Sequence, residues 1–308
     1  MQCKRLNSKW KTVINMKNNE IEIANPTRTR AIMETYGLNF KKSLGQNFLT
    51  DIKVLHNIVD AAEISEEDDV IEVGPGIGAL TEQLAKRAHQ VMAFEIDERL
   101  IPVLKETLAP YDNITVVQQD ILKANLEQQI EAHFDGHHQL KLVANLPYYI
   151  TTPIIMHLLE SEIHFDAIVV MMQKEVAQRL TAEPGTKNYG SLSIAVQYYT
   201  DAKIAFIVPK TVFVPQPKID SAVVRLTPQK PAKQPQDEQA FMQLVKGSFA
   251  HRRKSLWNNL LGIYGKNPAT KERLEKVLAQ VGIEKSIRAE RLTISQFIDL
   301  SNGLIEND

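Results

Sequence analysis

The strongest constraint on the fold is an alternation, between residues 69 and 226, of short apolar β-rich runs with segments of helical spacing. This pattern is typical of βαβ units, in which helices join parallel strands and cover the faces of the sheet. The expected strands are residues 70–73, 90–95, 115–118, 141–144, 167–172, 202–208 and 221–226. We therefore predict an α/β fold with a seven-stranded, mostly parallel sheet.

The chain is expected to continue into a small helical domain. Because the proline-rich segment 209–217 is too short for a helical crossover, the last two strands are predicted to pair antiparallel at the sheet edge. The segment TPQKPAKQPQDE (227–238) is typical of a linker, and beyond it apolar residues recur at helical spacing with no further strand pattern. The predicted parts are a basic N-terminal extension (1–40, with 1–15 disordered), a main domain (41–228) and an all-α domain (229–308).

Charge is unevenly distributed along the 308 residues, although the net charge is only -1. Residues 1–50 hold 9 Lys and Arg against 3 Asp and Glu, residues 51–228 hold 14 against 25, and residues 229–308 hold 13 against 9. Two basic ends around an acidic middle would suit a polyanionic partner, with chemistry in the middle. Two merely solvated basic surfaces would give the same pattern, so charge alone leaves both interpretations open.

Composition excludes several classes of protein. A single cysteine, Cys3, rules out an internal disulfide framework and makes a catalytic thiol improbable. The longest uncharged stretch, 142–159, contains Asn145, His157, two prolines and two tyrosines, so it does not suit a lipid interior. The N-terminus lacks the apolar run of a secretory signal. We expect a cytoplasmic protein, with a monomer as the default state.

Residues 70–81 (VIEVGPGIGALT) have the pattern of a strand, a glycine-rich turn and the start of a helix. Such a turn lets the backbone approach a ligand closely, and the helix N-terminus favours an anion. Gly74, Gly76 and Ala79 fit G-x-G-x-x-A, and Glu95 follows about 20 residues later, as a dinucleotide site also requires. A nucleoside ligand is predicted, and the turn alone does not identify it.

Three acids favour S-adenosylmethionine as that ligand. Glu72 lies two residues before Gly74, Glu95 ends the second strand where it could hold ribose hydroxyls, and Asp120 ends the third where it could accept from an adenine amine. Together they resemble the motifs of Rossmann-like methyltransferases. The alternatives are that Asp120 is a helix N-cap before Ile121 and that Glu95 is a surface acid.

The segment Asn145-Leu146-Pro147-Tyr148 follows the fourth strand and resembles the N/D-P-P-Y/F tetrapeptide of amino-group methyltransferases. An adenine amine is a poor nucleophile, and acceptors on its N–H bonds, the Asn145 side-chain oxygen and the Leu146 carbonyl, would stabilise the positive charge that develops on nitrogen. Tyr148 would stack on the extruded base, and Phe213 could form the other face of a base sandwich or plug the domain junction. The alternative is that Asn145 and Pro147 simply turn the chain.

Four segments, KSLGQNFLTD (42–51), EVGPGIG (72–78), NLPYYITTP (145–153) and FVPQPKIDSAV (213–223), resemble the rRNA adenine dimethylase family, and within it the bacterial small-subunit type. The resemblance spans about residues 26–304 and implies a class I methyltransferase domain over 41–228. It implies dimethylation, with S-adenosylmethionine, of the N6 amines of two adjacent adenosines in the 3′-terminal hairpin loop of 16S rRNA, during 30S subunit assembly. By this resemblance Asn47 and Leu49 line the methionine end of the cofactor, Gly74 and its turn lie at the centre, Glu95 binds ribose, Asp120 binds adenine and Asn145 lies beside the methyl donor.

Basic residues near both ends are the predicted contacts to RNA phosphates: Lys41, Lys42, Arg252, Arg253 and Lys254. A solvated helix face is the alternative for residues 249–254. His133, His137 and His138 lie in a polar connection without a nearby cysteine, so we predict no metal site there. The rival functions are a 23S rRNA methyltransferase of antibiotic resistance, a non-catalytic RNA- or promoter-binding relative, and a dinucleotide-dependent oxidoreductase.

Overall fold

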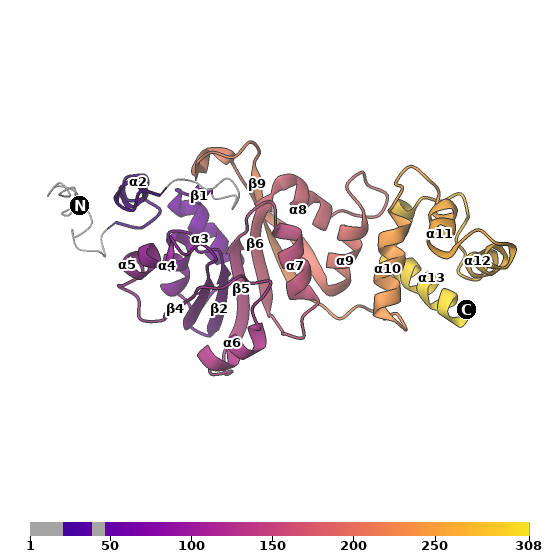
Figure 1. Ribbon diagram of the computed structural model, residues 1–308, viewed down its shortest axis with the longest axis horizontal. Helices are drawn as coiled ribbons and strands as arrows, with labels where there is room; N and C mark the ends of the chain where they lie inside the picture. The colour runs from indigo at the N-terminus through magenta and orange to yellow at the C-terminus, as the bar shows by residue number, and fades with distance from the viewer. Residues whose placement is uncertain (1–20, 39–46, 308) are drawn as a thin grey trace. The chain divides into compact units, whose positions relative to one another are not determined.

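The computed structural model describes residues 21–38 and 47–307, and it contains the predicted seven-stranded sheet, in the order β4-β3-β2-β5-β6-β9-β7 (Figure 1). Its strands are β2 (Asp68–Val73), β3 (Gln90–Phe94), β4 (Ile114–Val117), β5 (Gln139–Asn145), β6 (Ala167–Gln173), β7 (Thr200–Val208) and β9 (Ser221–Pro228). The pairs β3–β4, β2–β3, β2–β5 and β5–β6 are parallel, and the pair β6–β9 is antiparallel. The predicted fold class is confirmed.

The strand β2 begins two residues earlier than the apolar pattern indicates, and these two residues, Asp68 and Asp69, are buried acids. Asp68 pairs with Lys141 Nζ at 2.9 Å, and Asp69 Oδ1 lies 2.9 Å from Nδ1 of His89. Both partners come from neighbouring strand segments. Paired in this way, the two carboxyl groups can be buried at a strand start that looks polar in the sequence.

The connections from β2 to β6 are short helices, as βαβ units require. They are α4 (Ala79–Ala85), α5 (Ile101–Thr107), α6 (Leu126–His133) and α7 (Thr151–Leu159), and α3 (Ile52–Ala61) precedes β2. In α3 the buried residues Leu55, Ile58 and Val59 follow the i, i+3, i+4 spacing of one apolar face. In α4 every residue is buried, so a further segment must cover its outer side.

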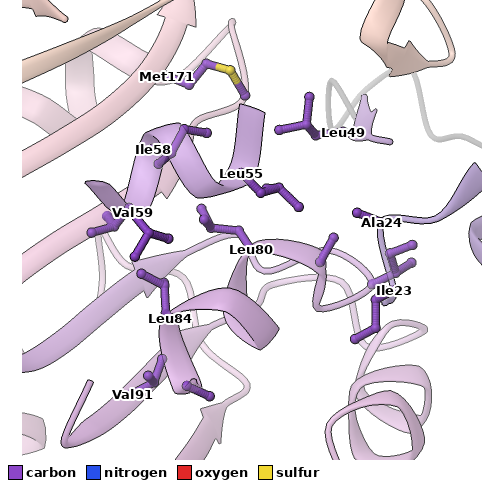
Figure 2. Close-up of a cluster of buried hydrophobic side chains, with 14 of the residues drawn as sticks. Ile23, Ala24, Leu49, Leu55, Ile58, Val59, Leu80, Leu84, Val91 and Met171 are labelled. Atoms are coloured by element: carbon purple, nitrogen blue, oxygen red, sulfur yellow. The ribbon is translucent and has the colours of Figure 1, made fainter. Parts of the chain in front are cut away.

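That covering segment is the N-terminal one, which the sequence analysis treated only as a basic extension. The helix α2 (Pro26–Thr35) has Pro26 at its start and Asn25 as its N-cap, and Figure 2 shows Ile23 and Ala24 beside the cluster formed by α3 and α4. Glu82 of α4 accepts from the Ile23 N–H at 2.8 Å. A buried carboxylate thus holds the chain where it enters the domain.

The edge strands also follow the prediction in position, with β7 and β9 adjacent and β7 outermost. The proline-rich connection between them contains the short helix η2 (Lys210–Val212) and a two-residue strand β8 (Phe213–Val214). The strand β8 pairs antiparallel with β1 (Phe48–Leu49), with Leu49 opposite Phe213. This small second sheet was not predicted from the sequence, because a strand of two residues carries no periodicity.

The chain divides into two compact units, one containing residues up to 174 with 203–227 and the other containing 175–202 with 228–308. The second unit contains α9 (Ser191–Tyr199), α10 (Glu238–Ser248), α11 (Leu256–Tyr264), α12 (Pro268–Gln280), η3 (Ala289–Arg291) and α13 (Ile294–Glu306), while α8 (Lys174–Leu180) begins at the division. We expected residues 175–202 in the main domain, but they belong to the second unit. Tyr198 packs on Phe241 with 5.2 Å between ring centroids, and the buried Tyr189 hydroxyl donates to the Leu292 carbonyl at 3.0 Å. Among the described helices, none has the length and apolarity needed to cross a membrane.

Replacing Glu82 with alanine tests the anchoring of the N-terminal segment. The change removes the acceptor of Ile23 N–H and of the Tyr111 hydroxyl (3.1 Å), and leaves Arg28, 3.7 Å away, without its buried partner. Removing one partner from a buried charged network typically costs about 2–5 kcal/mol. We expect a Tm lower by several degrees and new tryptic cleavage after Arg28 in limited proteolysis.

The matched control is Glu22→Gln, since Glu22 pairs with Lys86 at 3.1 Å on the surface. Such exposed pairs contribute about 0–1 kcal/mol, so Tm and protease resistance should stay close to wild type. A Glu82→Ala protein with wild-type Tm and wild-type resistance would contradict the anchoring role.

Candidate active site

Parallel pairing brings the ends of three central strands to one edge of the sheet. Val73 is in register with Phe94, and Glu72 with Val143, so the residues that follow β2, β3 and β5 emerge together. A cavity of about 1160 Å³, counted with its open mouth, lies at this edge. Open α/β sheets bind their ligands at this position.

The glycine turn forms one wall of the cavity. Gly74, Gly76 and Gly78 have φ values of 73°, 62° and 92°, in the left-handed region that side chains disfavour. A Cβ added to Gly76 would lie 2.9 Å from the Phe48 ring, whereas one added to Gly74 would meet no atom within 4 Å. Gly74 therefore faces open space where a ligand can approach the backbone.

Glu95 follows β3 and is held in place by backbone donors. Its two oxygens accept from Asp97 N–H at 2.7 Å and from Gly76 N–H at 3.3 Å, and the residue is only 5% exposed. Burial raises the pKa of Glu95, while these hydrogen bonds lower it in part. The alternative that Glu95 is a surface acid is wrong.

Asp120 lines the same cavity at the end of β4. Its Oδ1 accepts from Leu122 N–H at 3.1 Å within a turn, and no helix begins at Ile121. The next helix, α6, begins at Leu126 with Asn125 as its N-cap. The N-cap alternative for Asp120 is therefore wrong, because the carboxylate stabilises a turn and still borders the cavity.

Glu72 is the buried acid to which the sequence analysis gave no role beyond its place in the motif. It is 1% exposed, lines the cavity, and its Oε2 has no hydrogen-bond partner among the described residues. Burial raises its pKa to about 8, and the nearby Glu95 carboxylate adds to that increase. An unpartnered buried carboxylate oxygen at a cavity wall suits a ligand that carries positive charge.

The tetrapeptide emerges from β5 with each residue fixed differently. Asn145 donates through Nδ2 to the Asn47 carbonyl at 3.3 Å, so its remaining polar atom, Oδ1, is an acceptor. Leu146 N–H donates to the Met171 carbonyl at 3.1 Å, and the Pro147 carbonyl accepts from Thr151 Oγ1 at 2.9 Å. The Tyr148 hydroxyl lies 2.7 Å from Ser221 Oγ, and burial raises its pKa.

Asn47 and Leu49 line the cavity wall. The β1–β8 pairing and a bond from Thr50 N–H to the Val212 carbonyl at 2.9 Å hold residues 48–50 in place. Phe213, on β8, is 3% exposed, packs in the hydrophobic core and is not among the described residues that line the cavity. Its position favours a packing role over stacking on a base.

The structure brings ten predicted site residues to one cavity. They are Asn47, Leu49, Gly74, Gly76, Glu95, Asp120, Asn145, Leu146, Pro147 and Tyr148. The described lining includes three carboxylates, with Glu72 the third, and contains no Lys, Arg or His. An acidic lining without basic side chains favours a cationic ligand over the anionic pyrophosphate of a dinucleotide.

The predicted phosphate contacts are only partly described. Lys41 and Lys42 lie outside the described residues, and Arg252, Arg253 and Lys254 are exposed in the turn between α10 and α11. The helix expected in the alternative for residues 249–254 is wrong, because the structure has a turn there, and a solvated surface stays the alternative to a phosphate contact. Arg252 donates to Glu290 at 3.1 Å and also to the Lys187 carbonyl, so it is partly engaged within its own unit.

One of the three discounted histidines, His138, lies near His89 and Asp135, with candidate metal-ligand atoms within 4.8 Å of one another. The two imidazole rings are stacked at 3.7 Å between centroids and 15° between planes. Lone pairs in parallel ring planes do not converge on one ion. This geometry therefore gives no support to a metal site.

Glu72→Gln tests the buried carboxylate in the ligand-free protein. With a pKa of about 8 when folded and 4.5 when unfolded, Glu72 contributes stability that is complete below about pH 4.5 and lost as the pH rises through about 8. The glutamine variant does not titrate there, so we expect its Tm to fall by a few degrees less than that of wild type between about pH 5 and pH 9. Glu66→Gln, at an exposed site, is the control, and parallel Tm curves for wild type and Glu72→Gln would contradict the burial effect.

Comparison with known proteins agrees with this site. A family model described as ribosomal RNA adenine dimethylase matches residues 37–304. A protein of Ligilactobacillus salivarius named ribosomal RNA small subunit methyltransferase A is 69% identical over 292 residues, which cover 94% of this chain and 99% of that protein.

Two solved structures share the fold at lower identity. A dimethyladenosine transferase from Plasmodium falciparum has a TM-score of 0.67 and 27% identity, covering 82% of this chain and 95% of that one. The 23S rRNA methyltransferase ErmE has a TM-score of 0.63 and 28% identity, covering 84% and 99%. The family predicted from the motifs is confirmed: the chain belongs to the ribosomal RNA adenine dimethylase family.

Proposed function

We propose that this chain uses S-adenosylmethionine to dimethylate the N6 amines of two adjacent adenosines in the 3′-terminal hairpin loop of 16S rRNA, within the immature 30S subunit. The observation that carries the proposal is that Asn145 and Tyr148 line the same cavity as Glu95 and Asp120. One cavity thus combines groups suited to a nucleoside with groups suited to an amine. The family to which the chain belongs acts on rRNA adenine.

The cavity residues fit the cofactor in charge and in shape. S-adenosylmethionine supplies a methyl group on a positively charged sulfur, which is a good leaving group. The open space at Gly74 lets a ligand approach the backbone closely. The buried Oε2 of Glu72, which has no hydrogen-bond partner among the described residues, favours a ligand with positive charge. We assign Asn47 and Leu49 to the methionine end, Glu95 to the ribose hydroxyls and Asp120 to the adenine amine, with Gly74 and Gly76 at the centre.

The tetrapeptide then acts on the target amine by accepting hydrogen bonds. Asn145 Oδ1 and the Leu146 carbonyl accept from the two N–H bonds, which stabilises positive charge developing on nitrogen. The Pro147 carbonyl is already used by Thr151 and Ile150, so Leu146 is the main-chain acceptor that we assign. Attack precedes proton loss, and therefore no general base is assigned; positioning contributes most of the rate.

Recognition of the RNA is assigned to exposed cations and to the loop structure of the substrate. Arg253 and Lys254 are exposed, and no ion pair in the described part of the chain involves them, so both can contact phosphates. Unpaired loop bases are extruded at lower cost than bases of a duplex. Arg252 contributes the guanidinium N–H groups that its bonds within the protein leave free. We further assign the enzyme to the cytoplasm, where its substrate is assembled, and expect it to act as a monomer.

Labelled methyl transfer to separate ribosomal particles tests this function. Wild-type protein and labelled S-adenosylmethionine are incubated with unmethylated immature 30S particles, 50S particles or naked 23S rRNA, and the modified bases are mapped. We expect label on two adjacent adenosines of the 16S terminal hairpin. Label confined to 23S rRNA would favour the rival enzyme, and no label on any RNA would favour a non-catalytic relative.

Asn145→Ala is the matched variant for the same assay. The hydrogen bond from the amine to the amide oxygen strengthens as positive charge develops on nitrogen, so transfer should be abolished while the Kd for S-adenosylmethionine changes by less than about ten-fold. Glu95→Ala provides the contrast, because a ribose contact exists before and during reaction and its loss should raise the KM for the cofactor. Near-normal turnover by Asn145→Ala would contradict the assigned role.

A further inference from the structure

Ser221 connects the target-binding tetrapeptide to a strand on the other side of β6. It is the first residue of β9, is fully buried, and its Oγ lies 2.7 Å from the Tyr148 hydroxyl. This serine lies within one of the four segments that resemble the family, and it is not among the described residues that line the cavity.

The backbone around Ser221 is fixed independently of Tyr148. Asp220 accepts twice, through its carbonyl from Lys174 N–H at 3.1 Å and through Oδ1 from Lys210 N–H at 3.0 Å. Ser221 itself is in register with Gln173 in the β6–β9 pair. The hydroxyl of Ser221 therefore offers a rigid point of attachment.

Tyr148, in contrast, lies in an irregular turn between β5 and α7 and is half-buried. A hydrogen bond at the hydroxyl restricts the first side-chain torsion, because rotation about it would move the hydroxyl away from Ser221. Burial raises the pKa of the Tyr148 hydroxyl, which keeps its proton and can donate to Ser221. The bond thus fixes where the ring lies at the cavity wall before a base arrives.

We propose that Ser221 is a positioning residue for the target base: its hydroxyl holds the Tyr148 ring in the pose against which the extruded adenine stacks. The inference rests on the proposed function, because it requires Tyr148 to face the base. Ser221 touches neither cofactor nor substrate in this account. It acts through Tyr148 alone.

A double-mutant cycle tests the proposal with Ser221→Ala, Tyr148→Phe and the double variant. Each is assayed for kcat of methyl transfer to immature 30S particles, and for quenching of 2-aminopurine placed at the target position of the RNA hairpin. Losing a neutral buried hydrogen bond should lower kcat by about five-fold. Both singles and the double should show the same loss and weaker quenching, while S-adenosylhomocysteine binds within about two-fold of wild type.

Ser248→Ala is the control, since Ser248 is also fully buried but its Oγ has no partner among the described residues. It should retain wild-type kcat and quenching. If Ser221→Ala fails to fold, as judged by its melting curve, Tyr148→Phe still tests the bond because it removes the other hydroxyl.

The outcomes separate this inference from the proposed function. Wild type that transfers no methyl group to RNA overturns the proposed function and the inference with it. If wild type transfers normally, two results overturn the inference alone. One is a kcat of Tyr148→Phe within about two-fold of the wild-type value, and the other is a double variant in which the losses of the two single variants multiply.

Discussion

The site depends on the parallel pairing of β2 with both β3 and β5. That register aligns the ends of the three strands, so the glycine turn, Glu95 and Asn145 are delivered to one edge although they are far apart in sequence. Side chains alternate along a strand, and a slip of one residue would move Glu72 from the cavity wall to the opposite face of the sheet. The apolar residues of β2, β5 and β6, most of which are buried on both faces of the sheet, support this pairing.

A second consequence of this arrangement is a pair of buried acidic side chains. Glu72 and Glu95 both have raised pKa values because of burial, and neither faces a positively charged side chain among the described residues of the cavity wall. Burying such groups reduces the stability of the ligand-free protein. Local departures from the best packing are expected at functional sites, and a cationic cofactor would offset this one.

Sequence patterns predicted the central sheet and most of the site. Seven strands, the glycine turn and the tetrapeptide were visible because each carries a local signal: β-rich apolar runs, glycines or a distinctive residue order. Asn47 and Leu49 came only from family resemblance, because β1 has two residues and finds its partner, β8, more than 160 residues later. Glu82 and Ser221 gave no local signal at all, since their importance lies in the distant Ile23 N–H and Tyr148 hydroxyl that they bind.

The division into units was hidden for the same reason. Residues 175–202 have ordinary helical spacing, and only their packing with the helices after residue 228 shows where they belong. Tertiary contacts between segments far apart in sequence decide such boundaries, whereas the proline-rich linker marks only one of the three crossings, the one at residues 227–228.

The central claim is that one cavity holds the sulfonium cofactor and presents an adenine amine to Asn145. A crystal structure of the protein with a non-reactive cofactor analogue and an RNA hairpin measures this directly. We predict the target N6 within about 3 Å of Asn145 Oδ1, with the cofactor ribose at Glu95. An analogue bound outside the cavity, or an amine that does not approach Asn145, would contradict it.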